Sequence, residues 1–356
     1  MRQAVNDAPC NLVAGMTGEQ GAAGEPRPLT FSLLRLLADG EFHSGEVLAQ
    51  QLQVSRASVN NALSDVGQYG LTLHRIRGRG YRLPNPPQWL EVNRLHTLLG
   101  KDAGIFGIQI LDTAVSSNSL LLQRAAAGAA HGSVLAVEWQ SGGRGRLGRQ
   151  WHSGLGNALT FSLLWRFDCG LSGLSGLSLV VGIALVRALR QLGLQGVGLK
   201  WPNDLVAAEG KLSGILIEAQ GDMLGPTAVV IGIGINCSLP DAVMERIDQP
   251  VSDLSRLSGG QQPDRNLLLA MVLRQMANVL GVFAQSGFAS FREEWENCHI
   301  FQDKPVQLRL PDGDTVGGIA RGVNEEGALL VETQSLAGGS ARVQAYHAGE
   351  ISLRGI

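Results

Sequence analysis

An arginine- and glycine-rich segment is the part of the sequence best suited to hold an anion. It reads Ser141-Gly-Gly-Arg-Gly-Arg-Leu-Gly-Arg149, with three arginines and no acidic residue. Glycines let a backbone approach a ligand closely, and neighbouring arginines repel one another unless an anion joins them. We therefore expect a loop that is mobile when empty and ordered over a phosphate-bearing ligand. It matches neither a Walker loop nor a dinucleotide fingerprint, so alone it is equally compatible with an RNA-binding or merely exposed segment.

Two lysines are a second candidate for anion chemistry, because lysine is scarce in this chain. Only four of the 29 basic residues are lysines. Lys200 opens the motif Lys-Trp-Pro-Asn-Asp, and Lys211 lies eleven positions further on, in Gly-Lys-Leu-Ser-Gly-Ile-Leu-Ile-Glu, across an expected β-hairpin. An ammonium group is a compact charge suited to a carboxylate or a transferring phosphoryl group. Each lysine alone could equally be a solvated surface residue, and we expect this for Lys101 and Lys304.

A further short motif, Gly232-Ile-Gly-Ile-Asn236, follows an apolar run. Its glycines permit close packing of the backbone. Asn236 could orient a phosphate or a metal-bound water. Taken alone, the pattern is only a weak sign of a site.

Three short helices followed by a β-hairpin are expected near the N-terminus. Apolar residues recur at helical spacing from Leu29, Ser44 precedes a second helix, and Ser55 opens a third whose apolar side runs to Val66. Residues 71–83 then have the pattern of two short strands around a glycine-containing turn. This order predicts a winged helix-turn-helix.

The hairpin and the third helix carry side chains that suit DNA. The hairpin has four arginines and no acid, a local charge of +4 in a chain of net charge −2. Guanidinium groups bind phosphates in a fork, and polar side chains at the start of a recognition helix can read base edges. DNA binding is therefore favoured over a packing or protein–protein module, and half-site recognition would require a dimer. The candidate DNA-binding residues are Ser55, Arg56, Asn60, Arg75, Arg77 and Arg79.

The elements that must position these groups change in character along the chain. In the middle we expect strands at 134–139, 159–165, 215–218 and 228–235 and helices at 177–192 and 266–283. Beyond Asp303, short alternating runs between glycine-containing turns predict a small SH3-like β-barrel. The predicted fold class is therefore α+β with several domains: an N-terminal winged helix-turn-helix, a central α/β domain with a mixed sheet, and the C-terminal barrel.

Composition excludes several classes of protein. With 356 residues, 44 % apolar and 17 % charged, the chain is long enough for two or three domains with buried cores. Its four cysteines are far apart and form no CxxC pair, which predicts free thiols of a reducing compartment and neither a zinc site nor a disulfide framework. No secretory signal is expected, and the longest apolar stretch, around 177–186, is about half of a membrane span. We expect a cytoplasmic protein with no membrane association.

The four motifs in this order resemble those of biotin protein ligases. The arginine-rich hairpin, the segment Gly-Glu-Phe-His-Ser-Gly-Glu at 40–46 and the expected barrel extend the likeness to nearly the whole chain. The resemblance favours the bifunctional type, which is also the biotin operon repressor. The expected division is a winged helix-turn-helix over 29–84, a ligase domain over 85–302 that begins with a proline-rich linker, and a C-terminal domain over 303–356. Residues 1–28 lie outside the resemblance and have the composition of a flexible extension.

The resemblance implies a reaction in two steps. The biotin carboxylate attacks the α-phosphate of ATP, with Mg²⁺, and gives biotinyl-5′-AMP and pyrophosphate. A lysine of a biotin carboxyl carrier protein, part of acetyl-CoA carboxylase, then attacks the mixed anhydride and expels AMP. As corepressor, biotinyl-5′-AMP would also favour a homodimer that binds operator DNA.

Matching positions carry the site residues of the family onto this chain. Adenylation is assigned to Lys200 and Arg146. The resemblance assigns biotin binding to Ser116, Ser117, Asn118, Gln140, Arg144, Gly145, Arg146 and Lys211. It assigns ATP and adenylate binding to Arg149, Trp151, Asn203, Asn236 and Arg321. No metal ligand is assigned.

One departure from the family pattern concerns the biotin site. The family usually reads Asp-Ser-Thr-Asn where this chain has Val115-Ser-Ser-Asn118. Ser117 keeps the hydroxyl of the threonine, whereas Val115 removes a carboxylate, and Asp112 lies three residues upstream.

Other functions remain compatible with the sequence. The chain could be a ligase without operator binding, a ligand-sensing repressor without ligase activity, or a lipoate-type acyl transferase. A protein that only senses its ligand would not require Lys200 as well as Lys211, which argues against the sensor.

Overall fold

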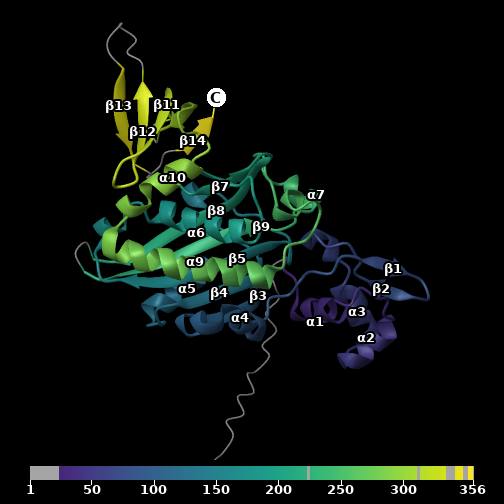
Figure 1. The fold of residues 1–356 in the computed structure, drawn as a ribbon. Coiled ribbons are helices and arrows are strands. Elements are labelled where there is room, and N and C mark those ends of the chain that lie inside the picture. The colour runs from purple at the N-terminus through teal and green to yellow at the C-terminus, as the bar shows by residue number, and fades with distance from the viewer. Residues whose placement is uncertain (1–23, 223–224, 311–312, 334–340, 348–351, 356) are drawn as a thin grey trace, which may run out of the picture.

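The computed structural model describes residues 24–222, 225–310, 313–333, 341–347 and 352–355 (Figure 1). Most of the extension expected over 1–28 therefore lies outside the described residues, and the first helix begins at Pro28. The N-terminal helices, the central sheet and the C-terminal strands follow one another along the molecule (Figure 1). This is the predicted fold class.

The N-terminal domain contains the three predicted helices and the hairpin. Ser44 and Ser55 cap the second and third helices as predicted, since each hydroxyl accepts a backbone N–H, at 3.1 and 3.0 Å respectively. The third helix is shorter than predicted: a 3₁₀ turn follows it and buries Val66. The elements are α1 (Pro28–Leu36), α2 (Gly45–Gln51), α3 (Arg56–Ala62), η1 (Val66–Tyr69), β1 (His74–Ile76) and β2 (Gly80–Arg82).

A seven-stranded sheet forms the centre of the middle domain, in the order β3-β4-β5-β9-β8-β7-β6. Only β3 and β4 are parallel, and all other neighbours are antiparallel, so the sheet is mixed, as predicted. The strands are β3 (Gly107–Ala114), β4 (Ser133–Gln140), β5 (Ala158–Phe167), β6 (Gly198–Lys200), β7 (Asp204–Ala207), β8 (Gly210–Gly221) and β9 (Thr227–Asn236).

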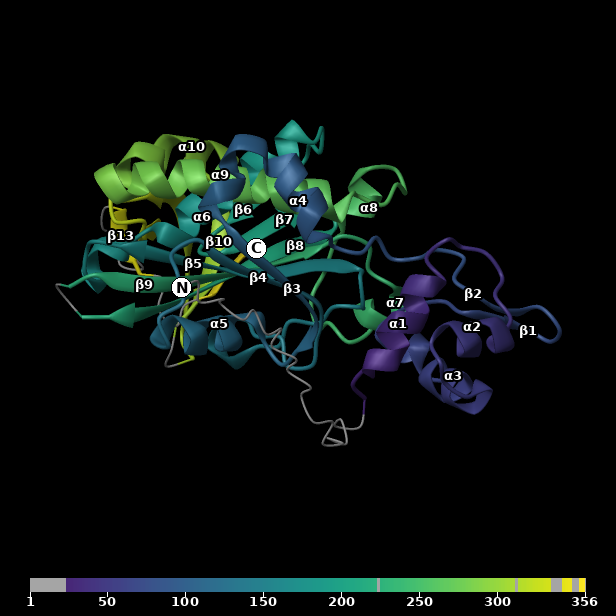
Figure 2. The ribbon, with the colours of Figure 1, turned by 90° about the horizontal axis from the view of Figure 1, so that it is seen from below.

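Helices cover both faces of this sheet. Figure 2 shows α4 (Val92–Leu99), α6 (Leu177–Gln191) and α9 (Arg265–Ser286) on one face and α5 (Ser117–Ala126) on the other. This layering brings the N-terminus of α5 to the end of β4. The remaining helical segments are η2 (Gly100–Ile105), η3 (Arg146–Gly148), η4 (Leu171–Leu174), α7 (Asp241–Met244), α8 (Leu254–Leu257), η5 (Ala289–Phe291) and α10 (Arg292–Cys298).

Two helical segments are long enough to cross a membrane, contrary to the expectation from the sequence. Residues 171–191 and 265–286 have the length and the mean hydropathy, 1.8 each, of a membrane span. In this structure they pack against each other and the sheet, and 56 % of each apolar window is buried in the protein. Core helices of this kind meet the same criteria, so their apolar character is accounted for by the fold.

The C-terminal domain is a five-stranded antiparallel sheet in the order β13-β12-β11-β10-β14. Its apolar side chains, including Val306 and Leu329, join the same hydrophobic core as the middle domain. The two domains are therefore packed together. The strands are β10 (Pro305–Arg309), β11 (Thr315–Val323), β12 (Leu329–Thr333), β13 (Arg342–Tyr346) and β14 (Ser352–Gly355).

The N-terminal domain also packs against the middle domain. Leu155, just before β5, is completely buried in the core of the N-terminal domain, and its N–H donates to the Tyr69 carbonyl at 2.8 Å. The Tyr69 ring meets Trp139 of β4 edge to face, with 5.9 Å between centroids. On the surface, Arg35 pairs with Asp112.

The linker between these domains is fixed by a buried ion pair. Arg265 Nη1 lies 2.7 Å from Glu138 Oε2, and the two side chains are 2 % and 0 % exposed. Arg265 also donates to the Gln88 carbonyl, and the Leu90 N–H donates to Glu138. Such a pair is costly to break because the remaining charge would stay buried.

Candidate active site

Most of the residues predicted to bind biotin and the nucleotide lie around two adjoining cavities, the first beside α5, β8 and β9 and the second beside β6, β7 and the start of β8. The first cavity has a volume of ≈ 50 Å³ and the second ≈ 570 Å³. All eight residues assigned to biotin line the first cavity. The second is lined by Lys200 and by four of the five residues assigned to the nucleotide: Arg149, Trp151, Asn203 and Asn236.

The floor of the first cavity is built by the N-terminus of α5. The Ser117 N–H donates to Gln140 Oε1 at 2.7 Å, which joins the helix to the end of β4. Ser162 Oγ donates to Asn118 Oδ1 at 2.5 Å and lies 2.8 Å from Ser117 Oγ. The floor is therefore a connected set of hydroxyl and amide groups that can present polar atoms to a ligand.

Asn118 has its amide engaged by the protein on both sides. Its Nδ2 donates to the Leu216 carbonyl and to Glu218 Oε2, at 3.2 and 2.9 Å. A Cβ on Gly232 would lie 2.2 Å from Asn118 Oδ1, so this position of β9 has to be glycine. These contacts make Asn118 a part of the cavity wall that orients its neighbours.

The arginine-rich segment forms a tight turn over the cavities. Arg144 pairs with Gln150 in an isolated β-bridge, and the Trp151 N–H donates to the Gly143 carbonyl at 2.9 Å. Arg144 Nη2 lies 2.6 Å from Glu218 Oε2, the carboxylate that also binds Asn118. That the turn loosens without a ligand and orders over one stays a prediction.

Arg146 lies at the junction of the two cavities and lines both. Its Nη1 donates to Asn203 Oδ1 at 3.3 Å. Burial lowers the pKa of Arg146, and the negative charge of Asp204 opposes this shift. A buried cation of this kind gains from an anion brought to its side.

The two candidate lysines lie on either side of Asp204. Lys200 is the last residue of β6 and faces Asp204 in the antiparallel register with β7. Lys211 is the second residue of β8, and its Nζ lies 2.7 Å from Asp204 Oδ1. Arg146 and Lys211 line both cavities at their junction, and Lys200 lines only the second cavity. Lys101 and Lys304 are exposed, as predicted.

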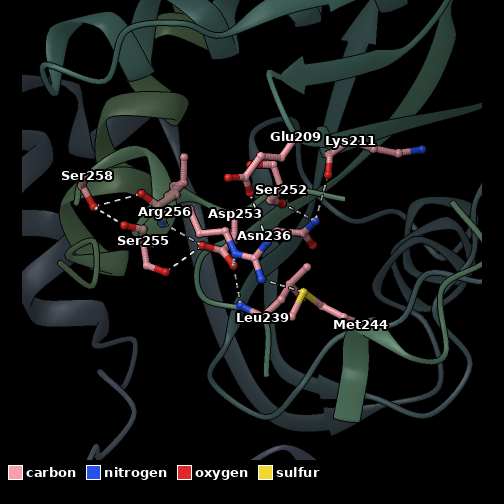
Figure 3. Close-up of polar contacts among 11 residues, drawn as sticks. Glu209, Lys211, Asn236, Leu239, Met244, Ser252, Asp253, Ser255, Arg256 and Ser258 are labelled. Carbon is pink, nitrogen blue, oxygen red and sulfur yellow. Dashed lines mark hydrogen bonds and ion pairs between the residues drawn. The ribbon is translucent and has the colours of Figure 1, made fainter. Parts of the chain in front are cut away.

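Asn236 fixes the wall of the second cavity (Figure 3). Its Nδ2 donates to the carbonyls of Ser252 and Lys211, at 3.0 and 3.3 Å. The Lys211 N–H donates to the Pro250 carbonyl, and the Ser252 N–H donates back to Lys211. Segment 250–252 is thereby aligned with the start of β8, and the ammonium end of Lys211 points away from this network (Figure 3).

Asp253 and Arg256 hold the same wall from behind (Figure 3). Asp253 accepts the backbone N–H groups of Leu239 and Arg256, both at 3.0 Å. Arg256 Nη1 reaches Glu209, in the turn between β7 and β8, at 3.1 Å. Asp253 is not predicted from the sequence, because an isolated acid carries no signal until its distant partner is known. Asp204 and Glu218 end the two lysine motifs, but no role is predicted for either.

Arg321 is the predicted site residue that the structure does not bring to the cavities. It lies on β11 and pairs with Asp303 Oδ1 at 2.7 Å and Glu332 Oε2 at 2.6 Å. It lines neither cavity, so the arrangement gives no support to its predicted contact with the nucleotide. Val115, the departure from the family pattern, is 69 % exposed.

The candidate DNA-binding residues lie on the exposed side of the N-terminal domain. Arg56 and Asn60 are exposed on α3, and Arg75, Arg77 and Arg79 are exposed on the hairpin. Two of these arginines rest on aromatic rings: Arg75 on Tyr81, and Arg79 on Phe42 at 4.2 Å from the ring centroid. Ser55 uses its hydroxyl to cap α3. The hairpin therefore exposes its arginine charges, while the side chains of Arg75 and Arg79 rest against aromatic rings.

Comparisons with known proteins assign each part of the chain. Residues 113–236 match the biotin/lipoate A/B protein ligase family, 30–82 match an HTH domain, and 302–354 match the biotin protein ligase C-terminal domain. These matches define the class of protein. It combines the catalytic domain of a protein ligase with a helix-turn-helix domain of a DNA-binding type.

Two relatives match this chain over nearly their whole length. The bifunctional ligase/repressor BirA of Salmonella typhimurium is 38 % identical over 92 % of this chain and 97 % of its own length. The bifunctional ligase/repressor BirA of Escherichia coli is 37 % identical over 90 % and 96 %. A biotin protein ligase from Aquifex aeolicus, solved in complex with biotin and ATP, superposes with a TM-score of 0.59 at 28 % identity, over 70 % of this chain and 98 % of that one. The chain belongs to the biotin protein ligase family.

Proposed function

We propose that this protein activates biotin with ATP and transfers the biotinyl group to a lysine of a carrier protein, and that it also represses transcription. The observation that carries the proposal is that Arg146 and Lys211 line two adjoining cavities and Lys200 lines the second of them. Similarity to the bifunctional ligase/repressors over nearly the whole chain supports it.

In the first step, a carboxylate oxygen of biotin attacks the α-phosphorus of ATP. The bond to the β-phosphate oxygen breaks, and pyrophosphate leaves. Negative charge gathers on the α-phosphate oxygens, where Lys200 and Arg146 stabilise it. Lys211 and Arg144 hold the biotin carboxylate, while Ser116, Ser117 and Gln140 bind the ring end.

In the second step, an amine of the carrier lysine attacks the carbonyl carbon of biotinyl-5′-AMP. An amide bond forms, AMP leaves, and the amine gives up a proton. The arginine-rich turn covers the mixed anhydride meanwhile and keeps water from it. Its position over the junction of the cavities supports this role.

Mg²⁺ enters with ATP as part of the substrate. Among the described residues, no group of three acidic, histidine or cysteine side chains could form a cage for a metal. Asp204 lines the second cavity but is paired with Lys211. Magnesium commonly binds through one or two carboxylates and the substrate phosphates, which fits this residue set better than a protein-only site.

A carrier-labelling assay tests the ligase function. Purified protein is mixed with ATP, Mg²⁺, a biotin carboxyl carrier domain and either biotin or lipoate. We expect biotin-dependent labelling of one carrier lysine and no lipoylation. An unmodified carrier would indicate a ligand sensor, and lipoylation would indicate an acyl transferase of the lipoate type.

A gel shift tests the repressor function. The probe is the promoter of the organism's own biotin genes, with and without biotin and ATP. We expect a salt-sensitive shift that strengthens when both ligands are present, because biotinyl-5′-AMP would favour a homodimer. Labelling activity without any shift would indicate a ligase with no operator role. A cytoplasmic location accords with both activities.

A further inference from the structure

Trp201, the residue after Lys200, connects the catalytic domain to the C-terminal domain. Its side chain is 1 % exposed, and the indole Nε1 donates to the Gly327 carbonyl at 3.1 Å. Gly327 lies in the turn between β11 and β12. The neighbour of the candidate adenylation lysine is therefore bonded to a different domain, over 126 positions of sequence.

The turn that accepts this bond is rigid. Asn324 Oδ1 accepts the N–H groups of Glu326 and Ala328, at 3.1 and 2.8 Å. Gly327 has a φ of +78°, and a Cβ there would lie 2.9 Å from the Cα of Gly176, next to the start of α6. Both the conformation and the close approach require glycine, so the turn has one position against the catalytic domain.

Two further contacts hold the residues that follow Lys200. Ser178 Oγ, on α6, donates to the Pro202 carbonyl at 3.0 Å. The Asn203 Nδ2 donates to the Ile215 carbonyl at 2.7 Å, and the Ile215 N–H donates to the Asn203 carbonyl at 3.0 Å. Residues 201–203 are thus held by α6, by β8 and by the C-terminal domain, each through a different residue.

We propose that Trp201 is a positioning residue for adenylation: its hydrogen bond to Gly327 lets the C-terminal domain fix the backbone from which Lys200 reaches the second cavity. The inference rests on the proposed ligase function. Misplacing a reacting group by about 1 Å can cost on the order of a hundredfold in rate. Trp201 lines the second cavity and is not among the residues that line the first. We therefore expect a change at Trp201 to slow adenylation without weakening biotin binding.

The test compares Trp201→Phe, which keeps an aromatic ring and removes the donor, with Gly327→Ala, which moves the acceptor. Gly313→Ala is the matched control, because Gly313 also has a positive φ, +94°, in another turn of the C-terminal domain, with no atom within 4 Å of its Cβ position. Three quantities are measured: pyrophosphate release with saturating biotin and ATP, biotin affinity by calorimetry, and transfer to the carrier from preformed biotinyl-5′-AMP.

We expect Trp201→Phe and Gly327→Ala to lose at least tenfold in pyrophosphate release, while biotin affinity and transfer stay within twofold of wild type. Gly313→Ala should stay within twofold in all three measurements. Pyrophosphate release within twofold of wild type in Trp201→Phe would overturn the inference, and so would an equal loss of all three quantities, which a merely structural role predicts. If the wild-type protein released no biotin-dependent pyrophosphate, the proposed function itself would fail, and the inference with it.

Discussion

Asp204 is the side chain on which the electrostatics of the site depend. It lies 2.7 Å from Lys211, opposes the lowering of the Arg146 pKa, and faces Lys200 across the β6–β7 pair. The second cavity is lined by four cations, Arg146, Arg149, Lys200 and Lys211, and by three carboxylates, Asp204, Glu209 and Asp248. The excess positive charge is what a carboxylate and a phosphate would neutralise, and these are the two groups that adenylation joins.

Replacing Lys200 by Ala should leave biotin binding intact and remove most adenylation. Lys200 lines only the second cavity, and loss of one group that stabilises developing charge costs about 10²–10³ in rate. Pyrophosphate release and calorimetric biotin binding measure the two effects. Lys101→Ala, at an exposed lysine, is the matched control. Near-normal pyrophosphate release from Lys200→Ala would refute the assignment.

The arginine-rich turn between β4 and β5 is the element that we propose retains the intermediate. It is tied to the sheet through Arg144 and Glu218 and reaches the β6–β7 turn through Arg146 and Asn203. Among the described residues, the turn contains the short 3₁₀ segment η3 and one β-bridge, and it belongs to no strand of the sheet. Such a segment can open and close at low cost.

Arg146→Gly should release biotinyl-5′-AMP before transfer. The free mixed anhydride would then label lysines of bystander proteins, such as added serum albumin, which mass spectrometry detects. Arg309→Gly, at an exposed position of β10, serves as control. If Arg146→Gly kept its selectivity for the carrier, the turn would not act as a lid.

The junction between α10 and β10 should make stability depend on pH. His299 stacks on Trp295, and burial lowers its pKa to about 4. Between pH 6.5 and 4 the unfolded chain binds a proton that the folded chain does not, so the free energy of unfolding falls as the pH decreases, by up to about 3 kcal/mol. Urea unfolding across this range should show the fall, and His299→Gln should lack it. The exposed His74 provides the control: an equal change in His74→Gln would contradict the assignment.

The sequence patterns predicted the strands and helices that are rich in apolar residues. They did not predict the features that depend on contacts between residues far apart in the sequence. Strands 134–139 and 228–235 were recognised because they are buried on both faces, whereas β3 is an edge strand with a half-exposed pattern and was not recognised. The third helix was drawn too long because Val66 is buried from a 3₁₀ turn. The motif residues line both cavities, but the ion pair of Arg321 with Asp303 joins β11 to the turn before β10, a contact that only the fold creates.

At the scale of the whole molecule, the DNA-binding type of domain is packed onto the segment that leads from the arginine-rich turn to β5. Leu155 is buried in its core, while Arg35 and Asp112 meet on the surface with 42 % and 36 % of their side chains exposed. Burial of an apolar side chain outweighs an exposed ion pair. Leu155 is therefore the main anchor between the domains.

Leu155→Ala should destabilise the protein by about 3 kcal/mol, within the range for buried leucines. Arg35→Ala should cost about 1 kcal/mol or less, since exposed ion pairs contribute little. Urea unfolding at pH 7 measures both, and near-equal losses would contradict the ranking of the two contacts.

Exchange of labelled pyrophosphate into ATP is the most direct test of a single site where these cations act together. Biotin-dependent exchange occurs only if biotinyl-5′-AMP forms reversibly from biotin and ATP. The wild-type protein should exchange label only when biotin is present, and Lys200→Ala should bind biotin yet exchange almost none. Exchange that proceeds equally without biotin, or that survives in Lys200→Ala, would contradict a single site in which these side chains join a vitamin carboxylate to a nucleotide.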